Sequence, residues 1–377
     1  MLRICFVVDL PVPALGGGAE LQCYLIARGL VTRGWDVVYV THKTIPRMEI
    51  GFKVCRADAY LKGDSWIAKY SRGLAIIRTL GRIDPDIVFF TNPGSEGGFV
   101  VLSSLLSRKR VVYRAASSAD ADLTFGRDGW NRFGLIARNL HRFAVTNADV
   151  IVTNAVHVAS RFSEYLPEKN IRVIPNGLEI DERGIAEHTK DEPSHILWIG
   201  RMERWKNPEA FVRLAKKLPE IRFVMCGSGS LYKHVAEEAS RVPNLTLTGG
   251  VDGEPKLALL RKAIALVNTS FVEGFPNTLI EAGIHCLPYI SFVDPDEVIC
   301  RYKLGFHPKS FSELVEITSS VAKDKQIRSQ IGARIRRYVE KNHDIRDTVS
   351  EYDRLLRSLL RPRESSTTHV GDDQHHR

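Results

Sequence analysis

Hydrophobic and polar positions follow a repeating order along this chain. Short continuous apolar runs, the first at residues 3–10, are each followed by a polar or glycine-rich loop and then by apolar residues at helical spacing. Continuous apolar runs are typical of parallel strands that are buried on both faces. The order strand, loop, helix therefore predicts βαβ units assembled into a parallel sheet.

The first half of the chain is expected to hold one such series. Its strands are predicted at residues 3–10, 35–41, 48–56, 84–92, 109–114, 148–153 and 171–174. Its helices are predicted at residues 19–33 and 65–80, in a segment that ends at about 107, and at 131–146 and 156–165. The stretch 115–130 is polar and is expected to form a loop.

The alternation stops after residue 178 and restarts at residue 195. Strands are then predicted at 195–200, 221–226, 244–248, 265–270 and 288–293, and helices at 208–218, after 227–230, at 254–262, from 277 and between 312 and 360. Two series separated by a charged, irregular segment predict two doubly wound α/β domains. The expected division is an N-terminal domain at 1–178, a linker at 179–194, a C-terminal domain at 195–335, helices at 336–361 that pack back on the N-terminal domain, and a disordered tail at 362–377.

The composition limits the class of protein. A chain of 377 residues accommodates two domains, and it has no apolar run near the roughly 20 residues of a membrane span. Its six cysteines are scattered without a C-x-x-C pair, which predicts reduced thiols and a cytoplasmic location. The net charge of +9 indicates either a generally basic surface or weak docking to an anionic membrane. No nucleic-acid-binding module accompanies this charge, so nucleic acid is not expected as a partner.

Two glutamates mark the candidate site. Glu273 lies in a tight loop between a predicted strand and a helix that starts near Asn277, and Glu281 lies little more than one turn inside that helix. A helix N-terminus has unpaired N–H groups and partial positive charge, which suit a phosphate. Carboxylates beside it are better suited to accept hydrogen bonds from sugar hydroxyls. Because the same spacing is common on solvated helices, the prediction depends on the flanking sequence G-F-P-N-T-L and on the strand–loop–helix context.

Three further loops contain cations or glycines that suit the same ligand. Two cations after one strand of the second domain can clamp a diphosphate, and a glycine pair after the next strand leaves room beside the backbone. The glycine run in the first loop of the chain lacks the G-x-G-x-x-G spacing, and it either exposes N–H groups to a ligand or forms a simple turn. In chain order, these residues are Gly16, Gly17, Gly18, Arg201, Lys206, Gly227 and Gly229. Together the loops predict a sugar-nucleotide pocket.

In these segments the chain resembles the retaining glycosyltransferases of the GT-B fold, in glycosyltransferase family 4 (glycosyl transferases group 1). The resemblance covers about residues 1–360 and depends on segments 16–20, 175–177, 200–207, 227–229 and 273–281. It implies the fold class: α/β, with two doubly wound Rossmann-like domains that face a central cleft.

The resemblance also implies roles for the matching residues. Arg201 and Lys206 would bind the donor diphosphate and stabilise the leaving group, Glu273 would contact the donor sugar, and Glu281 would bind the ribose. The catalytic set is thus Glu273, Arg201 and Lys206. The donor-binding set is Gly17, Gly18, Arg201, Lys206, Gly227, Gly229, Glu273, Gly274, Phe275, Pro276, Asn277, Thr278 and Glu281. No metal or other cofactor is expected, because cationic side chains and helix N-termini would stabilise the departing diphosphate.

The acceptor side departs from the family pattern. Many members carry a histidine after the strand that corresponds to residues 109–114, but here the sequence is V-V-Y-R-A-A-S-S, and Asn154 stands where a serine is common. The acceptor-side candidates are therefore Asn92, Arg114 and Ser117.

The expected function is transfer of a sugar, with retention of its anomeric configuration, from a nucleotide-sugar donor to a glycan or lipid-linked acceptor. A UDP-sugar is the favoured donor, the setting is surface polysaccharide or lipopolysaccharide biosynthesis, and the location is the cytoplasm at the inner face of the membrane. Two alternatives stay open. One is an epimerase or hydrolase of the same fold, for which no acid–base pair is identified. The other is a non-catalytic subunit that binds sugar nucleotides, which the missing histidine favours and the intact donor residues oppose.

Overall fold

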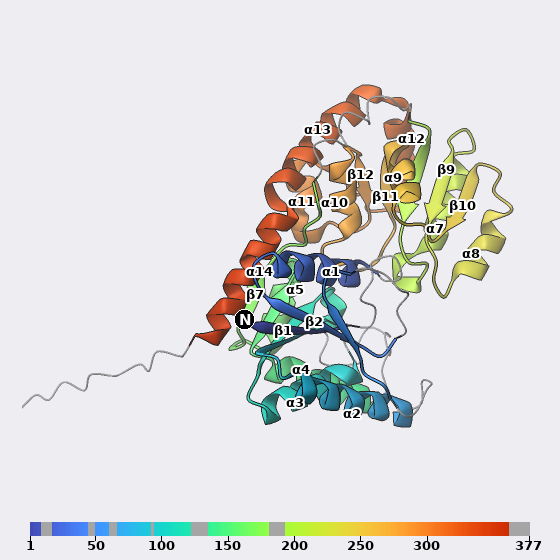
Figure 1. Cartoon of the computed structure of the whole chain (residues 1–377). Coiled ribbons are helices and arrows are strands. Elements are labelled where there is room, and N and C mark those ends of the chain that lie inside the picture. The colour runs from blue at the N-terminus through green and yellow to red at the C-terminus, as the bar shows by residue number, and fades with distance from the viewer. Residues whose placement is uncertain are drawn as a thin grey trace, which may run out of the picture.

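The protein consists of two parallel sheets, each covered by helices (Figure 1). The computed structural model describes residues 1–8, 17–43, 50–59, 66–91, 94–121, 135–180 and 193–361. Gly16, Asn92, most of the predicted linker and the predicted disordered tail lie outside these residues.

The N-terminal sheet has seven strands in the order β3-β2-β1-β4-β5-β6-β7. The strands are β1 (Arg3–Val7), β2 (Asp36–Thr41), β3 (Lys53–Arg56), β4 (Ile87–Phe90), β5 (Arg110–Ala115), β6 (Val150–Thr153) and β7 (Ile171–Val173). Its helices are α1 (Gly18–Val31), α2 (Trp66–Ile83), α3 (Ser95–Leu106), α4 (Leu135–Asn147) and α5 (Val156–Tyr165), with a 3-10 turn, η2 (Ser118–Ala121). Strand β1 sits at the switch point of the sheet, as expected of a doubly wound domain.

The C-terminal sheet has six strands and repeats this pattern in the order β10-β9-β8-β11-β12-β13. The strands are β8 (His195–Ile199), β9 (Phe223–Cys226), β10 (Leu245–Gly249), β11 (Ala263–Asn268), β12 (Tyr289–Ser291) and β13 (Gly305–Phe306). Its helices are α7 (Pro208–Lys217), α8 (Tyr232–Ala239), α9 (Glu254–Arg261), α10 (Asn277–Ile284), α11 (Val298–Tyr302), α12 (Phe311–Lys323) and α13 (Lys325–Asn342), with 3-10 turns η3 (Arg204–Lys206) and η4 (Pro295–Glu297). Helix α11 and the two-residue β13 are elements that the sequence pattern did not predict, because both are too short to show a period.

Strand β1 shows why the apolar runs in the sequence are continuous. Ile4 and Phe6 pack into the core on one face of the sheet, beside α1, whereas Cys5 and Val7 pack into the core on the other face, beside α2 and α3. Because successive side chains of a strand point to opposite faces, a strand covered on both sides needs apolar residues throughout. The prediction of two doubly wound α/β domains is confirmed, whereas the exact domain boundaries stay predictions.

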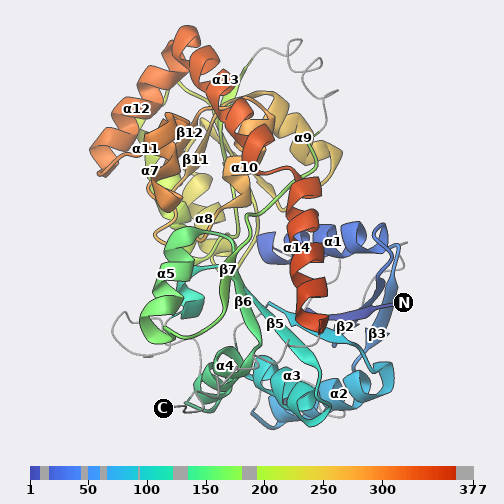
Figure 2. The ribbon, with the colours of Figure 1, turned by 90° about the vertical axis from the view of Figure 1, so that its left-hand side faces the viewer.

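The last helix, α14 (Ile345–Leu360), leaves the C-terminal domain and packs on the N-terminal one (Figures 1 and 2). Its Tyr352 and Leu356 are buried in the same cluster as Phe6, and Trp35 donates a hydrogen bond to Asp353 over 2.6 Å. The chain therefore crosses between the domains twice. The two crossings run side by side, because the Leu178 N–H donates to the His343 carbonyl over 3.0 Å and the Ile345 N–H donates to the Leu178 carbonyl over 3.1 Å.

None of the helices in the described ranges combines the length and the apolar content that would be needed to cross a lipid bilayer.

Candidate functional site

The predicted loop after β11 lies where the two domains meet, and we call residues 273–276 the junction loop. A side chain at Gly274 would place its Cβ atom 2.3 Å from the Ala116 carbonyl oxygen and 2.6 Å from Oδ1 of Asn154. Both of these residues belong to the N-terminal domain, at the carboxyl ends of β5 and β6. Glycine is therefore required here so that the two backbones can approach each other.

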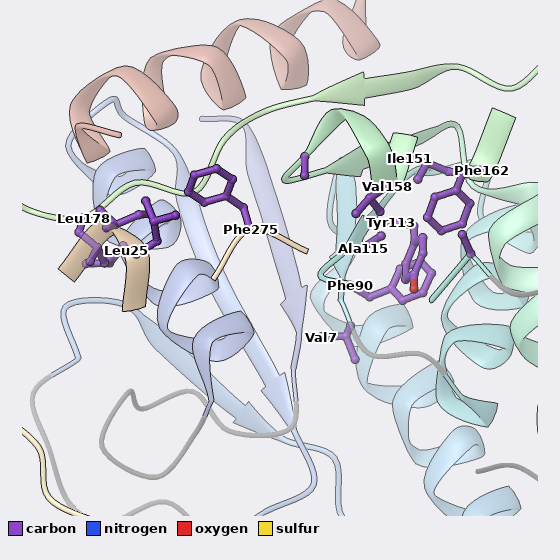
Figure 3. Packing of buried hydrophobic residues seen from close by; sticks show 14 of the residues in the cluster. Val7, Leu25, Phe90, Tyr113, Ala115, Ile151, Val158, Phe162, Leu178 and Phe275 are labelled. Carbon is purple, nitrogen blue, oxygen red and sulfur yellow. The ribbon is translucent and has the colours of Figure 1, made fainter. Parts of the chain in front are cut away.

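Phe275 anchors the junction loop in the core between the domains. Its side chain is 5% exposed and belongs to the same buried cluster as Leu25 and Leu178 of the N-terminal half (Figure 3). Its ring lies 4.5 Å from the ring of His343, and its carbonyl accepts a hydrogen bond from the Asn176 side chain over 2.9 Å. Phe275 thus fixes the loop, and its ring has no exposed face for a ligand.

Asn277, the first residue of α10, is also held by the N-terminal domain. Its Nδ2 donates to the Gly18 carbonyl over 3.2 Å, and its Oδ1 accepts from the side chains of Gln22 and Asn176. Pro276 precedes the helix, and its side chain cannot accept a hydrogen bond. The first N–H groups of α10 therefore receive no side-chain cap from this position. Gly18 and the N-terminus of α10 are therefore brought together, as the predicted donor site requires.

Glu273, the first residue of the junction loop, forms an ion pair with Lys206. Lys206 lies in η3, after β8, and its Nζ donates to Oε1 of Glu273, which also accepts a hydrogen bond from the Ser270 hydroxyl over 2.7 Å. Two residues of the predicted catalytic set are thus in direct contact. The lysine holds the carboxylate in a fixed position, and the carboxylate compensates the lysine charge.

Arg201 reaches toward the first loop of the chain from the C-terminal domain. Its side chain is exposed, and its guanidinium lies 5.4 Å from the centre of the Trp205 ring. A Cβ atom at Gly17 would be 3.6 Å from Nε of Arg201, so the two residues face each other across the junction. The Gly17 N–H itself donates to the Glu20 carboxylate over 2.9 Å.

Gly227 and Gly229 line the loop after β9, next to the loop that carries Arg201. Gly227 has φ of 155°, and a Cβ atom there would lie 1.8 Å from the Gly200 carbonyl oxygen. Gly229 is packed in the same way against the backbone of Met202. The glycine pair therefore lets two neighbouring loops touch, which is a structural requirement in addition to the predicted contact with a ligand.

Glu281 has a partner that the sequence analysis missed. Lys256, in α9, donates to Oε1 of Glu281 over 2.6 Å. Burial alone would lower the pKa of Lys256, but the Glu281 carboxylate outweighs it, so the pKa is raised and the lysine stays charged. Glu281 is 9% exposed, and among the described residues its Oε2 has no hydrogen-bond partner. A buried carboxylate oxygen without a donor is costly, so this atom is suited to bind a hydroxyl group of a ligand.

Thr278 does not offer its hydroxyl freely. Its Oγ1 lies 3.0 Å from the Tyr289 hydroxyl, and burial raises the pKa of Tyr289 above its ordinary value, so the phenol stays protonated. The contact of Thr278 with the nucleotide-sugar donor stays a prediction.

The acceptor-side prediction for Arg114 does not fit the structure. Arg114 is 2% exposed, its Nη2 donates to Asn176 over 2.6 Å, and it interacts with the Tyr352 hydroxyl of α14. The alternation of β5 places this side chain on the face that α14 covers. Arg114 is therefore buried between Asn176 and Tyr352, where an acceptor cannot reach it. Ser117 is half-buried in the loop beside Ala116, close to the junction loop.

Other polar residues lie at the carboxyl edge of the N-terminal sheet. A small cavity of about 20 Å³ there is lined by Thr41, His42 and Glu96, among others, and Glu96 accepts a hydrogen bond from Arg72 over 3.0 Å. His42 and Glu96 were not singled out in the sequence, because no local motif surrounds them. Across the junction, the ring of His157 lies 3.2 Å from the Glu273 carbonyl, and this contact was missed for the same reason.

Within the described ranges, no cluster of three or more histidine, cysteine, aspartate or glutamate side chains is placed to hold a metal ion. Independence of metal stays a prediction.

Comparison with protein families matches both halves of the chain. The family model described as Glycosyltransferase Family 4 matches residues 16–182, and the model described as Glycosyl transferases group 1 matches residues 181–338.

Two curated relatives show what kind of protein is similar. The α-galactosylglucosyldiacylglycerol synthase of Streptococcus pneumoniae is 25% identical over 168 residues, which cover 40% of this chain and 45% of the relative. An α-1,4-N-acetyl-D-galactosaminyltransferase of Campylobacter jejuni, whose named acceptor is an undecaprenyl-diphosphate-linked saccharide, is 29% identical over 120 residues, 30% of this chain and 33% of the relative. The alignments thus span less than half the length of either relative.

Solved structures share the fold over nearly the whole chain. The sucrose-phosphate synthase of Thermosynechococcus elongatus superposes with a TM-score of 0.77 at 14% identity, covering 95% of this chain and 99% of that protein. Anabaena HepE, solved with UDP and glucose, gives 0.74 at 15% identity and covers 95% and 100%. WaaG, a glycosyltransferase of lipopolysaccharide biosynthesis, gives 0.72 at 15% identity and covers 93% and 99%.

The close approach at Gly274 generates a prediction. In Gly274→Ala the added methyl group must displace backbone at Ala116, so we expect a loss of stability of about 1–3 kcal/mol and a larger separation of the domains. Urea unfolding and the radius of gyration from small-angle X-ray scattering measure the two effects. Gly81→Ala is the matched control, because nothing lies within 4 Å of its added methyl group. Equal stability and equal radius in the two variants would contradict the assigned contact.

Proposed function

This chain belongs to the glycosyltransferases of family 4 with the GT-B fold, and from this premise we propose that it transfers a sugar from a nucleotide-sugar donor to a glycan or lipid-linked acceptor. The observation that carries the proposal is the arrangement of the predicted residues at the junction: Lys206 contacts Glu273 just ahead of α10, and Arg201 faces Gly17. In the part of the chain that the structure describes, Oε2 of the buried Glu281 has no hydrogen-bond partner.

The donor diphosphate would lie between the two cations and the first turn of α10. Arg201 offers a planar fork of N–H donors and Lys206 a single charge, and the helix N-terminus adds unpaired N–H groups. Lys206 contacts Glu273, so a bound diphosphate would compete with this carboxylate for the lysine. The carboxylate would then accept hydrogen bonds from sugar hydroxyls. Glu281 would receive a ribose hydroxyl at Oε2 while Lys256 holds its other oxygen.

The transfer step needs no carboxylate nucleophile. The bond between the anomeric carbon and the phosphate oxygen breaks, the acceptor oxygen bonds to the same face of that carbon, and the acceptor proton passes to the leaving phosphate. Arg201 and Lys206 would stabilise the negative charge that develops on the diphosphate. Retention of configuration is supported by the family, and Glu273 is already engaged as a hydrogen-bond acceptor by Lys206 and Ser270.

The structural neighbours and relatives support a class of donor and acceptor. HepE was solved with UDP, and so was TarM of Staphylococcus aureus, which favours UDP as the nucleotide. The two curated relatives are named for a diacylglycerol glycolipid and for a polyprenyl-diphosphate-linked saccharide. We therefore propose a lipid-linked or glycan acceptor in the synthesis of a surface polysaccharide or lipopolysaccharide.

A helix layer formed by α2, α3 and α4 supports docking at an anionic membrane. These helices cover the face of the N-terminal sheet that lies away from the C-terminal domain (Figure 1). The sequences of α2 and α4 contain basic residues and no aspartate or glutamate. Apolar side chains are exposed beside them, at Ile67, Tyr70, Leu74, Leu102, Leu105, Leu106 and Ile136. Exposed apolar groups among basic residues are typical of surfaces that contact anionic lipid headgroups.

Nucleotide binding tests the donor site. We expect one diphosphate among UDP, GDP and ADP, with UDP favoured, to raise the melting temperature without added metal, and Glu281→Gln to weaken its affinity about tenfold because a hydroxyl loses a charged acceptor. Thermal shift identifies the nucleotide and calorimetry measures the affinity. The exposed Glu220→Gln serves as the control and should bind as the wild type does. Equal affinities in the two variants would contradict the assignment of Glu281.

The nucleotide identified in this way determines which nucleotide-sugars are used as donors in a transfer assay. With an α-linked donor, we expect an α-linked product, which the coupling constant of the anomeric proton reports in NMR spectra. A β-linked product would contradict retention, and nucleotide binding without turnover of any donor would favour the non-catalytic alternative.

Membrane docking is tested by co-sedimentation with vesicles. Binding should rise with the fraction of anionic lipid and fall with salt, and replacing Arg78 and Arg82 together by alanine should weaken it by about 2 kcal/mol, roughly 30-fold. Both arginines are exposed on α2. The control is Arg241→Ala with Arg301→Ala, which removes the same charge from the C-terminal domain. Binding that ignores lipid charge, or that falls equally in both double variants, would contradict the docking surface.

A further inference from the structure

Helix α5 of the N-terminal domain is capped by a residue of the C-terminal domain. The residue before α5 is Ala155, which has no polar side chain. The N–H groups of Val156 and His157 instead donate to the two carboxylate oxygens of Asp296, each over 2.8 Å. A carboxylate that receives the first N–H groups of a helix stabilises that helix and is itself stabilised by the helix dipole. Asp296 thus ties the two domains together.

The turn that carries Asp296 is held in an unusual conformation. Asp296 and Glu297 have φ of 52° and 59°, so two consecutive residues with side chains lie in the left-handed region. This conformation costs free energy, and it persists where the surroundings impose it. The turn is fixed from behind by Asp294, whose carboxylate accepts from the N–H groups of Ile299 and Cys300 over 2.7 and 3.1 Å. The strained backbone aims the Asp296 side chain at α5.

The ring of His157 lies between two hydrogen-bond acceptors. Its Nδ1 is 2.8 Å from Oδ1 of Asp296, and its Nε2 is 3.2 Å from the Glu273 carbonyl oxygen. A carbonyl oxygen and an ionised carboxylate only accept, so both ring nitrogens must donate. Neutral imidazole carries a single N–H and could satisfy one of these contacts. The hydrogen bonds together therefore require the doubly protonated imidazolium.

The environment of His157 agrees with this assignment. Burial lowers the pKa of His157, but the hydrogen bonds to Asp296 and to the Glu273 carbonyl outweigh it, so the pKa is raised above the ordinary value. The pKa of Asp296 is lowered, because its hydrogen bonds to His157 and to two N–H groups outweigh its burial. A cation near a helix N-terminus is disfavoured by the dipole, so the imidazolium depends on the Asp296 charge.

Other charged groups on the elements around α5 are engaged elsewhere. Asp120 of η2 accepts the N–H groups of Ala116 and Ser117, Arg161 of α5 pairs with Glu164, and Glu297 of η4 is exposed beside Arg301. Strand β6 carries no titratable residue, and β7 carries Arg172. The Glu273 carboxylate pairs with Lys206. Asp294 accepts a hydrogen bond from the Ile299 N–H within its own turn. Burial raises the pKa of the Tyr338 phenol in α13, and the nearby charges of Asp296 and Asp294 raise it further.

We propose that His157, as an imidazolium held between Asp296 and the Glu273 carbonyl, is a positioning residue that fixes Glu273 for sugar transfer. The proposal rests on the proposed function of this site. The Glu273 side chain is held by Lys206 and Ser270 of its own domain, whereas its main chain is held by His157 of the other domain. Loss of the ring proton removes one of the two ring contacts and loosens the junction loop.

The sign of the pH dependence follows from this arrangement. We call the two hydrogen bonds that the His157 imidazolium donates, to Asp296 and to the Glu273 carbonyl, the clamp. The imidazolium is present below its pKa, so the clamp is complete at lower pH and is lost as the pH rises through the raised pKa of His157. Asp296 stays ionised throughout this range because its pKa is lowered. Turnover in the wild type should therefore fall on the alkaline side, with a midpoint above the ordinary histidine value.

Steady-state kinetics with water as the acceptor tests the positioning role. Release of UDP is followed with UDP-glucose, UDP-galactose and UDP-N-acetylglucosamine, and the fastest donor is carried through a pH series. His157→Gln should lower kcat about 10- to 100-fold, with little change in KM, and should lose the alkaline fall. Asp296→Asn keeps a capping oxygen but removes the charge, so it should move the alkaline fall to lower pH. His234→Gln, at an exposed histidine of α8, is the matched control and should keep the wild-type profile.

NMR titration of the histidine rings, labelled with ¹⁵N, tests the imidazolium without any need for activity. The signal absent from His157→Gln identifies the residue, and its pKa should lie above the ordinary value and fall in Asp296→Asn. Titration at or below the ordinary value in the wild type overturns the clamp. A shared pH profile of wild type and His157→Gln overturns the positioning role, even where nucleotide binding supports the proposed function. If no donor is turned over and no diphosphate binds, the proposed function and the positioning role fail together, while the titration still decides whether the clamp exists.

Discussion

The two domains of this chain meet through backbone contacts that leave no room for a side chain. Gly274 lies against the Ala116 carbonyl, and the carbonyls on either side of it, at Glu273 and Phe275, receive hydrogen bonds from His157 and Asn176. The junction loop is therefore shaped by both domains at once. The predicted donor residues come almost entirely from the C-terminal domain, yet the position of their central loop depends on the N-terminal one.

Three pairs of a cation and a carboxylate lie at or beside this junction: Lys206 with Glu273, Lys256 with Glu281, and His157 with Asp296. Removing charges from water is costly, so partly buried ion pairs are weak contributors to stability. Their common location suggests that they hold side chains in place for a ligand. Each predicted donor carboxylate has one oxygen bound by a lysine, which orients its other oxygen.

Much of the fold was predictable from local pattern. Apolar runs such as the one in β1 identify buried parallel strands because both faces of each sheet are covered, and the order of strands and helices then leads to two doubly wound domains. The loop from Glu273 to Asn277 was predictable because its glycine, proline and acidic residues lie within one short segment.

The contacts that complete the site were not predictable in this way, because they join distant segments. His157 is 116 residues from Glu273 and 139 residues from Asp296, and nothing in the sequence around it indicates a role. Lys256 looks like an ordinary helix-surface lysine until the fold brings it to Glu281 of α10. Arg114 was predicted at the acceptor side because it lies in the segment where many family members carry a histidine, but the helix that buries it lies at the far end of the chain.

A crystal structure of the protein with UDP bound tests the central claim most directly. The diphosphate is expected within hydrogen-bonding distance of Arg201 and Lys206 at the N-terminus of α10, with a ribose hydroxyl on Oε2 of Glu281 and with the junction loop still in contact with Ala116 and His157. A nucleotide bound elsewhere, or a junction loop that leaves the N-terminal domain when the nucleotide binds, would contradict the account.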